Sequence, residues 1–385
     1  MKLLAAAIAV AALGLPSAQA SSPATVPGLV YTAGYGNTIV ARYDPLTLAR
    51  TGPRVRLGGN ASSWSWSPGR RYLAVASFPQ RLTVIEVATM RVVSRVRLAS
   101  GGASVRAVTW ARGDRVLAVV ETSQGSIVTA VDPLAGRVVR TTVLTRPFTF
   151  ELARLRDGLV FLLGARGRIE SVRLAAVDAE GQVRITVIPQ VRAGFVARRE
   201  QQTPGLAVDP VGRKAYVVGG DRVVTVDLRT LAASDRGPLR TLAKFVAGAT
   251  RSAEWLGNGM LAFSGTNWDG QNNGPTGLRI VDVRSWTTRI VNRDARSFTV
   301  AAGRLLVENA LTRRAVVIAY GFDGAERYRL DLRESTWMKK QGRLGYACRQ
   351  AFLRSVVDLK TGSMLRTGFP IGTRCPTLLV DDSRG

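Results

Sequence analysis

Short hydrophobic runs separated by polar turns repeat along most of this chain. The segment Leu206–Leu231, LAVDPVGRKAYVVGGDRVVTVDLRTL, holds three such runs, LAV, AYVV and RVVTVDL, separated by PVGRK and GGD. Short runs rich in Val and Tyr, bounded by Gly, Pro and Asp, are typical of β-strands joined by tight turns. This segment therefore predicts three consecutive strands within 26 residues.

The same plan recurs elsewhere in the chain. The ten-residue stretches Trp66–Val75 (WSPGRRYLAV) and Trp110–Val119 (WARGDRVLAV) align without a gap, and Val208–Val217 (VDPVGRKAYV) has the same length. Weaker copies begin at Leu155, Val300 and Met338. Glycine suits the turn of each hairpin because it accepts positive φ at no steric cost. The expected turn glycines are Gly69, Gly113, Gly158, Gly212, Gly257 or Gly259, Gly303 and Gly342.

A third run follows each hairpin and ends near an acidic residue. These residues are Asp44, Glu86, Asp132, Asp178, Asp227, Asp282, Asp323 and Asp358, spaced 35 to 55 residues apart. A fourth run usually comes next, such as Arg91–Arg97 or Gln182–Ile188. Four strands every 40–50 residues are typical of a β-propeller blade. We interpret the repeated acids as turn-forming side chains.

The two ends of the chain predict how the ring closes. Leu378–Val380 resembles a first strand and Gly28–Tyr31 a second strand, so the C-terminal strand should complete the N-terminal blade and hide both open edges. Eight acidic markers predict an all-β propeller of eight four-stranded blades. Seven blades is the alternative, if Thr336–Phe369 is absorbed elsewhere.

The pattern hydrophobic-x-x-Pro-x-Gly-(Arg/Lys)-x-Tyr-Val, followed by Val-x-Val-Asp-Leu-x-Thr, resembles the YVTN-repeat, or YncE-like, β-propeller family. The match is best in Ser65–Leu98, Val108–Leu144 and Leu206–Leu231, although the namesake tripeptide here is YVV. WD40 repeats have a similar rhythm, but the Trp-Asp dipeptide is missing from the third strands. The resemblance implies association with surface layers, envelopes and protein interactions.

The N-terminus predicts export. Lys2 precedes an apolar run, Leu3–Leu15, which Pro16 ends, and Ala18–Ala20 has the small-x-small form of a signal peptidase site. We expect a signal peptide over 1–20 with cleavage after Ala20, a short leader over 21–27 and a single propeller domain over 28–385. An N-terminal membrane anchor is the alternative, but the run is shorter than the roughly 20 residues that a span needs.

Composition narrows the chemistry. Exactly two cysteines, Cys348 and Cys375, favour one disulfide in an exported chain, with two buried thiols as the alternative. The net charge is +27, carried almost entirely by arginine. A GC-biased genome explains the arginine simply, but such a basic field also attracts anionic polymers. We do not expect nucleic acid as a partner, and we expect a monomer.

The chain has no histidine. Ser-His-Asp and Cys-His catalysis are therefore excluded in their usual form, as are histidine-held metal and haem sites. A carboxylate pair or a carboxylate-held calcium ion remains open. We expect no cofactor, no resident metal and no catalytic residue.

The most unusual segment is Ser264–Gly277, SGTNWDGQNNGPTG, between the second and third strands of its blade. Its simplest interpretation is a plain turn-rich insertion. The alternative is a polar recognition loop built on Trp268, at a face where many propellers bind ligands. The candidate partner-binding residues are Asn267, Trp268, Asp269, Asn272 and Asn273. The loop matches a calcium loop only in part, because Gln271 replaces the second acid and Ile280 stands at the position of the bidentate Glu.

Two further sets of residues recur near the inner strands. Trp66, Trp110 and Trp255 occupy one site in three repeats, where we expect packing between blades rather than sugar stacking. Glu151 and Glu254 lie in expected innermost strands and are candidates for a carboxylate pair in the central channel. A solvated channel wall is the alternative.

The sequence thus favours a non-enzymatic, extracytoplasmic binding or scaffold propeller, docking an unknown protein or envelope glycan. One alternative is a hydrolase or lyase of the lactonase-like propeller type that works without histidine. It would need three or more acids that converge at one end of the channel. The other is adhesion to an anionic polymer, which a one-sided arginine patch would favour.

Overall fold

The computed structural model describes residues 29–32, 38–100, 104–145, 148–196, 201–239, 248–268, 273–309, 315–332, 335, 337–370 and 372–378. The expected signal peptide and leader lie outside the described residues and remain predictions. The described part of the chain contains 34 β-strands and one short 3₁₀ helix, Pro68–Arg70. None of its helices is long and apolar enough to cross a membrane.

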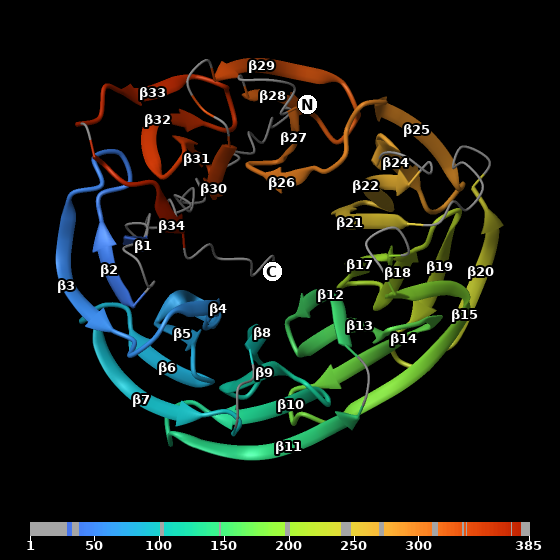
Figure 1. The fold of residues 1–385 in the computed structure, drawn as a ribbon, viewed down its shortest axis with the longest axis horizontal. Coiled ribbons are helices and arrows are strands. Elements are labelled where there is room, and N and C mark those ends of the chain that lie inside the picture. Colours follow the sequence, from blue (N-terminus) through green and yellow to red (C-terminus); the bar gives the residue numbers. More distant parts are fainter. Residues whose placement is uncertain are drawn as a thin grey trace, which may run out of the picture.

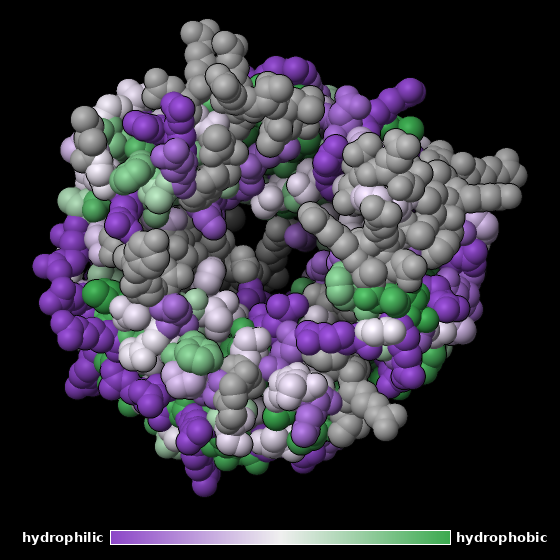
Figure 2. Space-filling view, in the orientation of Figure 1, coloured by the Kyte–Doolittle hydropathy of each residue, from purple (hydrophilic) through white to green (hydrophobic). Residues whose placement is uncertain are grey.

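The strands form sheets arranged in a ring, which is the architecture of a β-propeller (Figure 1). The space-filling view shows an opening at the centre of the ring, the central channel (Figure 2). Six sheets have four strands each. From the inner to the outer strand they are β34 (Pro376–Leu378), β1 (Leu29–Thr32), β2 (Ile39–Tyr43), β3 (Arg50–Arg56); β4 (Ala61–Trp66), β5 (Tyr72–Ser77), β6 (Arg81–Glu86), β7 (Arg91–Arg97); β8 (Ser104–Ala111), β9 (Arg115–Thr122), β10 (Gly125–Asp132), β11 (Arg137–Thr145); β17 (Gly205–Asp209), β18 (Lys214–Val218), β19 (Arg222–Asp227), β20 (Ala233–Pro238); β26 (Thr299–Ala301), β27 (Arg304–Asn309), β28 (Ala315–Tyr320), β29 (Glu326–Leu332); and β30 (Trp337–Gln341), β31 (Leu344–Arg349), β32 (Phe352–Asp358), β33 (Met364–Thr367).

The seventh sheet has ten strands and joins two parts of the ring that are not neighbours in sequence. Its strands are β12 (Phe148–Leu155), β13 (Gly158–Arg166), β14 (Ile169–Asp178), β15 (Val183–Phe195), β16 (Gln201–Thr203), β21 (Ala249–Gly257), β22 (Met260–Trp268), β23 (Asn273–Pro275), β24 (Leu278–Asp282) and β25 (Thr287–Asn292). The expected fourth strand at Gln182–Ile188 continues to Phe195. Its end pairs with β16, which in turn pairs in parallel with β21. This link passes beside β17, and the sequence did not predict it.

The ring closes where the two ends of the described chain meet. β34 pairs antiparallel with β1, with Val30 opposite Leu378 and Thr32 opposite Pro376. The C-terminal strand is thus the innermost strand of the N-terminal sheet, as the sequence predicts. Cys348 at the end of β31 and Cys375 just before β34 form a disulfide with a Cα–Cα distance of 5.9 Å. It fastens the closing strand to the neighbouring sheet.

The core lies between sheets rather than in one central layer. The ten-stranded sheet contains two groups of four strands, β12–β15 and β21, β22, β24, β25, and we call these and the six smaller sheets the four-strand groups. The described residues form eight hydrophobic clusters, and each cluster contains residues of two adjacent four-strand groups. Trp110 on β8 stacks on Tyr72 of β5 with ring centroids 6.0 Å apart, and Trp255 stacks on Tyr216 of the preceding sheet at 5.2 Å. Trp66 is buried in a third cluster. The interpretation of these tryptophans as packing residues is confirmed.

The repeated acids form turns, as predicted. The Asp227 carboxylate, for example, accepts hydrogen bonds from the backbone N–H groups of Arg229 and Thr230 and from the Thr230 hydroxyl. The same arrangement with Thr47 occurs at Asp44.

The expectation of a positive-φ glycine in every hairpin turn is wrong at Gly158 and Gly212. In the hairpin that contains Gly212, Arg213 has the positive φ instead, 48°. Gly158 starts β13, where a side chain would lie 1.9 Å from the carbonyl oxygen of Val177. Close approach between strands, rather than turn geometry, requires glycine there.

Candidate functional site on the inner strands and the β22–β24 connection

Glu151 lies at an irregularity in the innermost strand β12. The pairing of β12 with β13 shifts between Thr149 and Leu152, so two residues of β12 stand opposite one of β13. A bulge of this kind re-aims side chains and is common beside functional sites. Burial raises the pKa of Glu151 to about 7, and the negative charge of Glu254 on β21 adds to the effect.

The two acids proposed as a channel pair are therefore coupled electrostatically. A carboxyl group with a pKa near 7 can give or accept a proton at neutral pH. Catalysis by this pair would also need groups that bind and polarise a substrate. Within the described residues, no three carboxylate or thiol side chains gather as a metal site. The described inner strands thus bring the two proposed acids, Glu151 and Glu254, into electrostatic contact.

Side chains hold the inner strands β4, β8 and β12 together. Arg154 on β12 donates to the carbonyl oxygen of Val108 on β8 and to that of Trp64 on β4, both at 3.1 Å. The hydroxyls of Ser63 and Ser65 on β4 accept hydrogen bonds from the β8 backbone N–H groups, both at 2.9 Å. These bonds tie three successive four-strand groups at the channel, so the inner wall is a rigid support.

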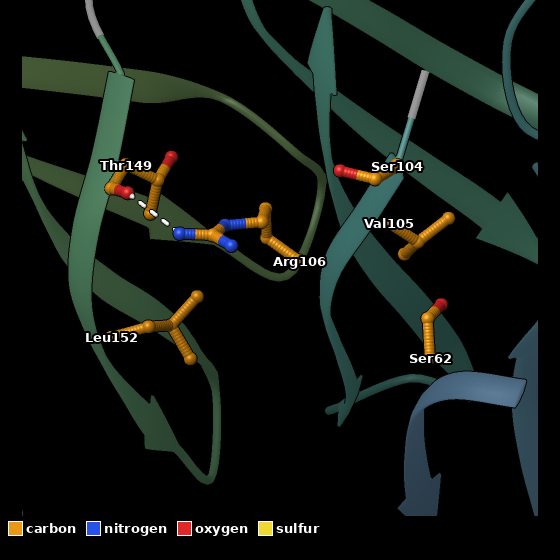
Figure 3. A pocket seen from close by; sticks show the side chains of 6 residues that line it. All are labelled: Ser62, Ser104, Val105, Arg106, Thr149 and Leu152. Atoms are coloured by element: carbon orange, nitrogen blue, oxygen red, sulfur yellow. Dashed lines mark hydrogen bonds between the residues drawn. The ribbon is translucent and has the colours of Figure 1, made fainter. Parts of the chain in front are cut away.

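A pocket of about 350 Å³ opens between these inner strands (Figure 3). It is lined by Ser62, Ser104, Val105, Arg106, Thr149 and Leu152. Figure 3 shows the Arg106 guanidinium reaching across the pocket toward the Thr149 carbonyl oxygen, 3.5 Å away. Arg106 also pairs with Glu121 at 3.0 Å. The volume and the mixed polar lining suit a small polar molecule.

The sequence alone did not predict this pocket. Its residues come from three separate repeats and meet only when the ring forms. The one available signal was Arg106, the single charged residue of the inner strand SVRAVTWA.

The β22–β24 connection begins as an extension of the sheet. β22 continues to Trp268 and pairs with β23, with Trp268 opposite Asn273 and Thr266 opposite Pro275. We call this unit the β22–β23 hairpin. The side-chain oxygen of Asn267 accepts a hydrogen bond of 2.7 Å from Arg251 of β21. Asn267 therefore anchors the base of the hairpin and is engaged within the fold, which the sequence did not predict.

The structure describes the other candidate residues of this connection only in part. Trp268 is half-buried, and its backbone N–H donates to the Gly248 carbonyl oxygen at 3.0 Å. Asp269 and Asn272 lie outside the described residues, and only the backbone of Asn273 is described. Ile280 is buried in β24, so that position of the calcium-loop pattern supplies no ligand.

Exposed arginines line two neighbouring outer strands. They are Arg50, Arg54 and Arg56 on β3 and Arg91, Arg95 and Arg97 on β7. Arg95 donates to the carbonyl oxygen of Arg56 at 3.1 Å, so the two strands lie side by side. Figure 2 shows hydrophilic side chains along this part of the rim. We call these six residues the β3–β7 arginine stripe.

Comparisons with known proteins show the fold and no family. No family model matches the sequence, and no curated protein matches it. Among solved structures, apo AztD from Citrobacter koseri has a TM-score of 0.58 at 13% identity, covering 90% of this chain and 96% of that one. BamB from Moraxella catarrhalis has a TM-score of 0.53 at 16% identity, covering 83% and 90%. Sqt1 from Saccharomyces cerevisiae has a TM-score of 0.53 at 11% identity, covering 80% and 84%.

These likenesses define the class of the protein as a β-propeller with four-stranded blades. Identities this low show the fold alone. The resemblance to the YVTN-repeat family remains a prediction.

Proposed function

We propose that this protein is an exported, non-enzymatic binding or scaffold propeller, and that its partner docks at the face bearing the β22–β23 hairpin. The observation that carries the proposal is the hairpin itself. Its strands are paired and its base is held by the Arg251–Asn267 hydrogen bond, so it presents the connection from a rigid platform. The described strands of the hairpin, held in this way, lose less conformational entropy on binding than a free segment would.

The hydrolase or lyase alternative would use Glu151 and Glu254, the two coupled acids of the inner strands. Within the described residues, no third acid joins them as a metal site. Export is supported by the sequence pattern over 1–20 and by the Cys348–Cys375 disulfide, because such bonds persist in oxidising compartments.

We also propose that the ring has eight blades. The ten-stranded sheet contains two four-strand groups, β12–β15 and β21, β22, β24, β25, that β16 links. With the six four-stranded sheets this makes eight groups, matching the eight hydrophobic clusters and the eight acidic markers. In this arrangement, β16 joins two blades on either side of the β17–β20 sheet.

Capture from an envelope extract tests the docking function. The mature chain, 21–385, is incubated with extract from its own source at low and at high salt, and the retained material is identified by mass spectrometry. We expect one protein or glycan to be retained at both salts, and Trp268→Ala to lose it. Phe78→Ala is the matched control, because Phe78 is an exposed aromatic residue in the corresponding connection of the β4–β7 sheet. No retention at either salt, or equal loss in both variants, would refute docking at the hairpin.

Adhesion to an anionic polymer is a second candidate, and the β3–β7 arginine stripe favours it. No acid within the described residues forms an ion pair with these six arginines, so their charge is available to a polyanion. We expect the elution salt from a heparin column to fall when Arg54, Arg56, Arg95 and Arg97 are all changed to Gln. Changing Arg137 and Arg140 of β11 to Gln is the control. Equal shifts per charge removed would mean that the +27 charge acts without a defined site.

A further inference from the structure

Two buried arginines flank the strand β22 on one face of its sheet. Arg251 of β21 stands opposite Gly265, and Arg279 of β24 stands opposite Phe263. Directly opposed residues project to the same face, and so do residues two apart along a strand. The two arginines therefore share a face, and Gly265 between them has no side chain. This face packs against the β17–β20 sheet, because Phe263 belongs to the cluster that contains Tyr216.

Neither arginine has an acidic partner within the described residues, although Arg251 is 3% exposed and Arg279 is 9% exposed. Arg251 donates to the carbonyl oxygens of Thr250, Thr266 and Gly220 and to Asn267, which are all neutral. Arg279 donates through Nε to the Thr276 carbonyl oxygen at 3.2 Å. Buried charges in proteins are normally paired, because leaving water is costly.

Asp221, the nearby acid, is bound to another arginine. Its carboxylate pairs with Arg222 at 3.0 Å. Burial lowers the pKa of Arg251 to about 10, and repulsion from Arg279 adds to the effect. Burial also lowers the pKa of Arg279. Arg222 is shared with Asp235 at 2.9 Å, so the charge of Asp221 still offsets the charge of Arg251 in part. Arg251 remains a cation at neutral pH, and no acid among the described residues is bound to either buried guanidinium.

Four buried polar atoms in this region have no hydrogen-bond partner among the residues that the structure describes. They are Arg251 Nε, Arg279 Nη1, Thr276 Oγ1 and Gln202 Nε2. Gln202 is 2% exposed and lies on β16 opposite Ala249, two residues before Arg251. Thr276 is 9% exposed, and its backbone N–H donates to the Gly265 carbonyl oxygen at 2.9 Å.

All four unpartnered groups can donate a hydrogen bond. They come from three segments, β16, β21 and the β23–β24 region, at the same end of one interface. A set of buried donors with an excess of positive charge is complementary to an oxyanion, and guanidinium groups bind carboxylate and phosphate oxygens strongly.

We propose that Arg251, Arg279, Thr276 and Gln202 form a binding site for one compact oxyanion, a carboxylate or phosphate group, at the base of the β22–β23 hairpin. Because all four side chains are buried, the ligand is limited to a small anion or to the terminal group of a larger one. A bound anion would neutralise the arginine pair and brace the hairpin that Arg251 and Asn267 anchor. This proposal stands independently of the docking function.

Calorimetric titration and thermal unfolding test the site. The dialysed mature chain is titrated with inorganic phosphate and, separately, with acetate, each against sodium chloride at equal ionic strength. We expect saturable binding of one anion per chain and a rise in Tm with at least one probe. The anion that binds with the higher affinity shows whether the site prefers phosphate or carboxylate.

Three variants locate the binding. We expect Arg279→Gln to weaken anion binding at least tenfold. Thr276→Val should weaken it severalfold, because it removes the hydroxyl while nearly keeping the shape of the side chain. Arg112→Gln, an exposed change in the turn between β8 and β9, should bind as the unchanged protein does. Circular dichroism confirms that each variant is folded. If Arg279→Gln does not fold, Thr276→Val is the variant that decides the test. An unchanged protein that shows no saturable binding would overturn the proposal, and so would a folded Thr276→Val that binds with unchanged affinity.

Discussion

Arg154 on β12 donates a 3.1 Å hydrogen bond to the carbonyl oxygen of Trp64 on β4, a residue 90 positions earlier in the chain. The same guanidinium bonds to Val108 on the strand between them. One side chain therefore crosses three four-strand groups beside the channel. A repeat ring has few such contacts beyond nearest neighbours, because each unit packs mainly on the next.

Replacing Arg154 with Met should destabilise the fold. The change keeps much of the aliphatic stem but removes two hydrogen bonds from a charged donor, and each is worth about 1–3 kcal/mol. We expect the free energy of unfolding in urea to fall by about 2–4 kcal/mol. Arg156→Met, at an exposed position in the adjacent turn, should change it by less than about 0.5 kcal/mol. Equal effects of the two changes would show that the bonds across the inner strands contribute nothing.

Removing the disulfide should loosen the closure of the ring. Cys348 and Cys375 are 27 positions apart, and such a crosslink stabilises a protein by about 2–4 kcal/mol. We expect the double variant Cys348→Ser, Cys375→Ser to have a lower Tm, measured by differential scanning calorimetry. Reductant should lower the Tm of the unchanged protein and leave that of the double variant unaltered. A reductant effect of the same size in both proteins would contradict this account.

Glu151 should make stability depend on pH between about 4.5 and 7. Its pKa is raised from 4.5 to about 7 in the fold, so the folded protein binds more protons than the unfolded chain in this window. Stability therefore falls as the pH rises through the window. Glu151→Gln should be more stable than the unchanged protein at pH 8, by on the order of 2 kcal/mol, with the difference vanishing below about pH 5.

Urea unfolding at pH 5, 6, 7 and 8 measures this effect of Glu151. Glu254→Gln should narrow the pH range over which stability falls, because it removes the negative charge that helps to raise the pKa of Glu151. Glu180→Gln, at an exposed turn, is the control. A pH profile of Glu151→Gln that parallels that of the unchanged protein would show that this carboxyl is not the titrating group.

Trp110 should tolerate Phe far better than Ala. It is 4% exposed and stacks on Tyr72 of the neighbouring sheet. We expect Trp110→Ala to lower the free energy of unfolding by about 3–5 kcal/mol through the cavity it leaves. Trp110→Phe keeps the stack and removes a buried indole N–H that has no acceptor among the described residues, so its loss of stability should be less than half as large. Urea unfolding measures both, and equal losses would mean that the aromatic stack contributes little.

The local pattern of the sequence was enough to predict the strands, the turn acids and the closing strand. Alternation between Val-rich runs and Gly-Asp turns depends on neighbouring residues, and it predicted β17, β18 and β19 almost to their observed ends. The repeat itself placed Trp66 and Trp110 at one kind of interface, because equivalent positions in a repeat have equivalent neighbours. The sequence also paired Cys348 with Cys375, since it offers no other thiol.

The tertiary structure alone decided which polar residues meet. Arg251 and Arg279 lie 28 positions apart and share a face only through the register of β21, β22 and β24. Gln202 joins them through the parallel pairing of β16 with β21, and the Arg106 pocket combines residues of three repeats. These encounters depend on ring closure and strand register, which bring together residues far apart in the chain. Hydrophobic periodicity indicates which face of a strand is buried, but it does not indicate which other segment packs against that face.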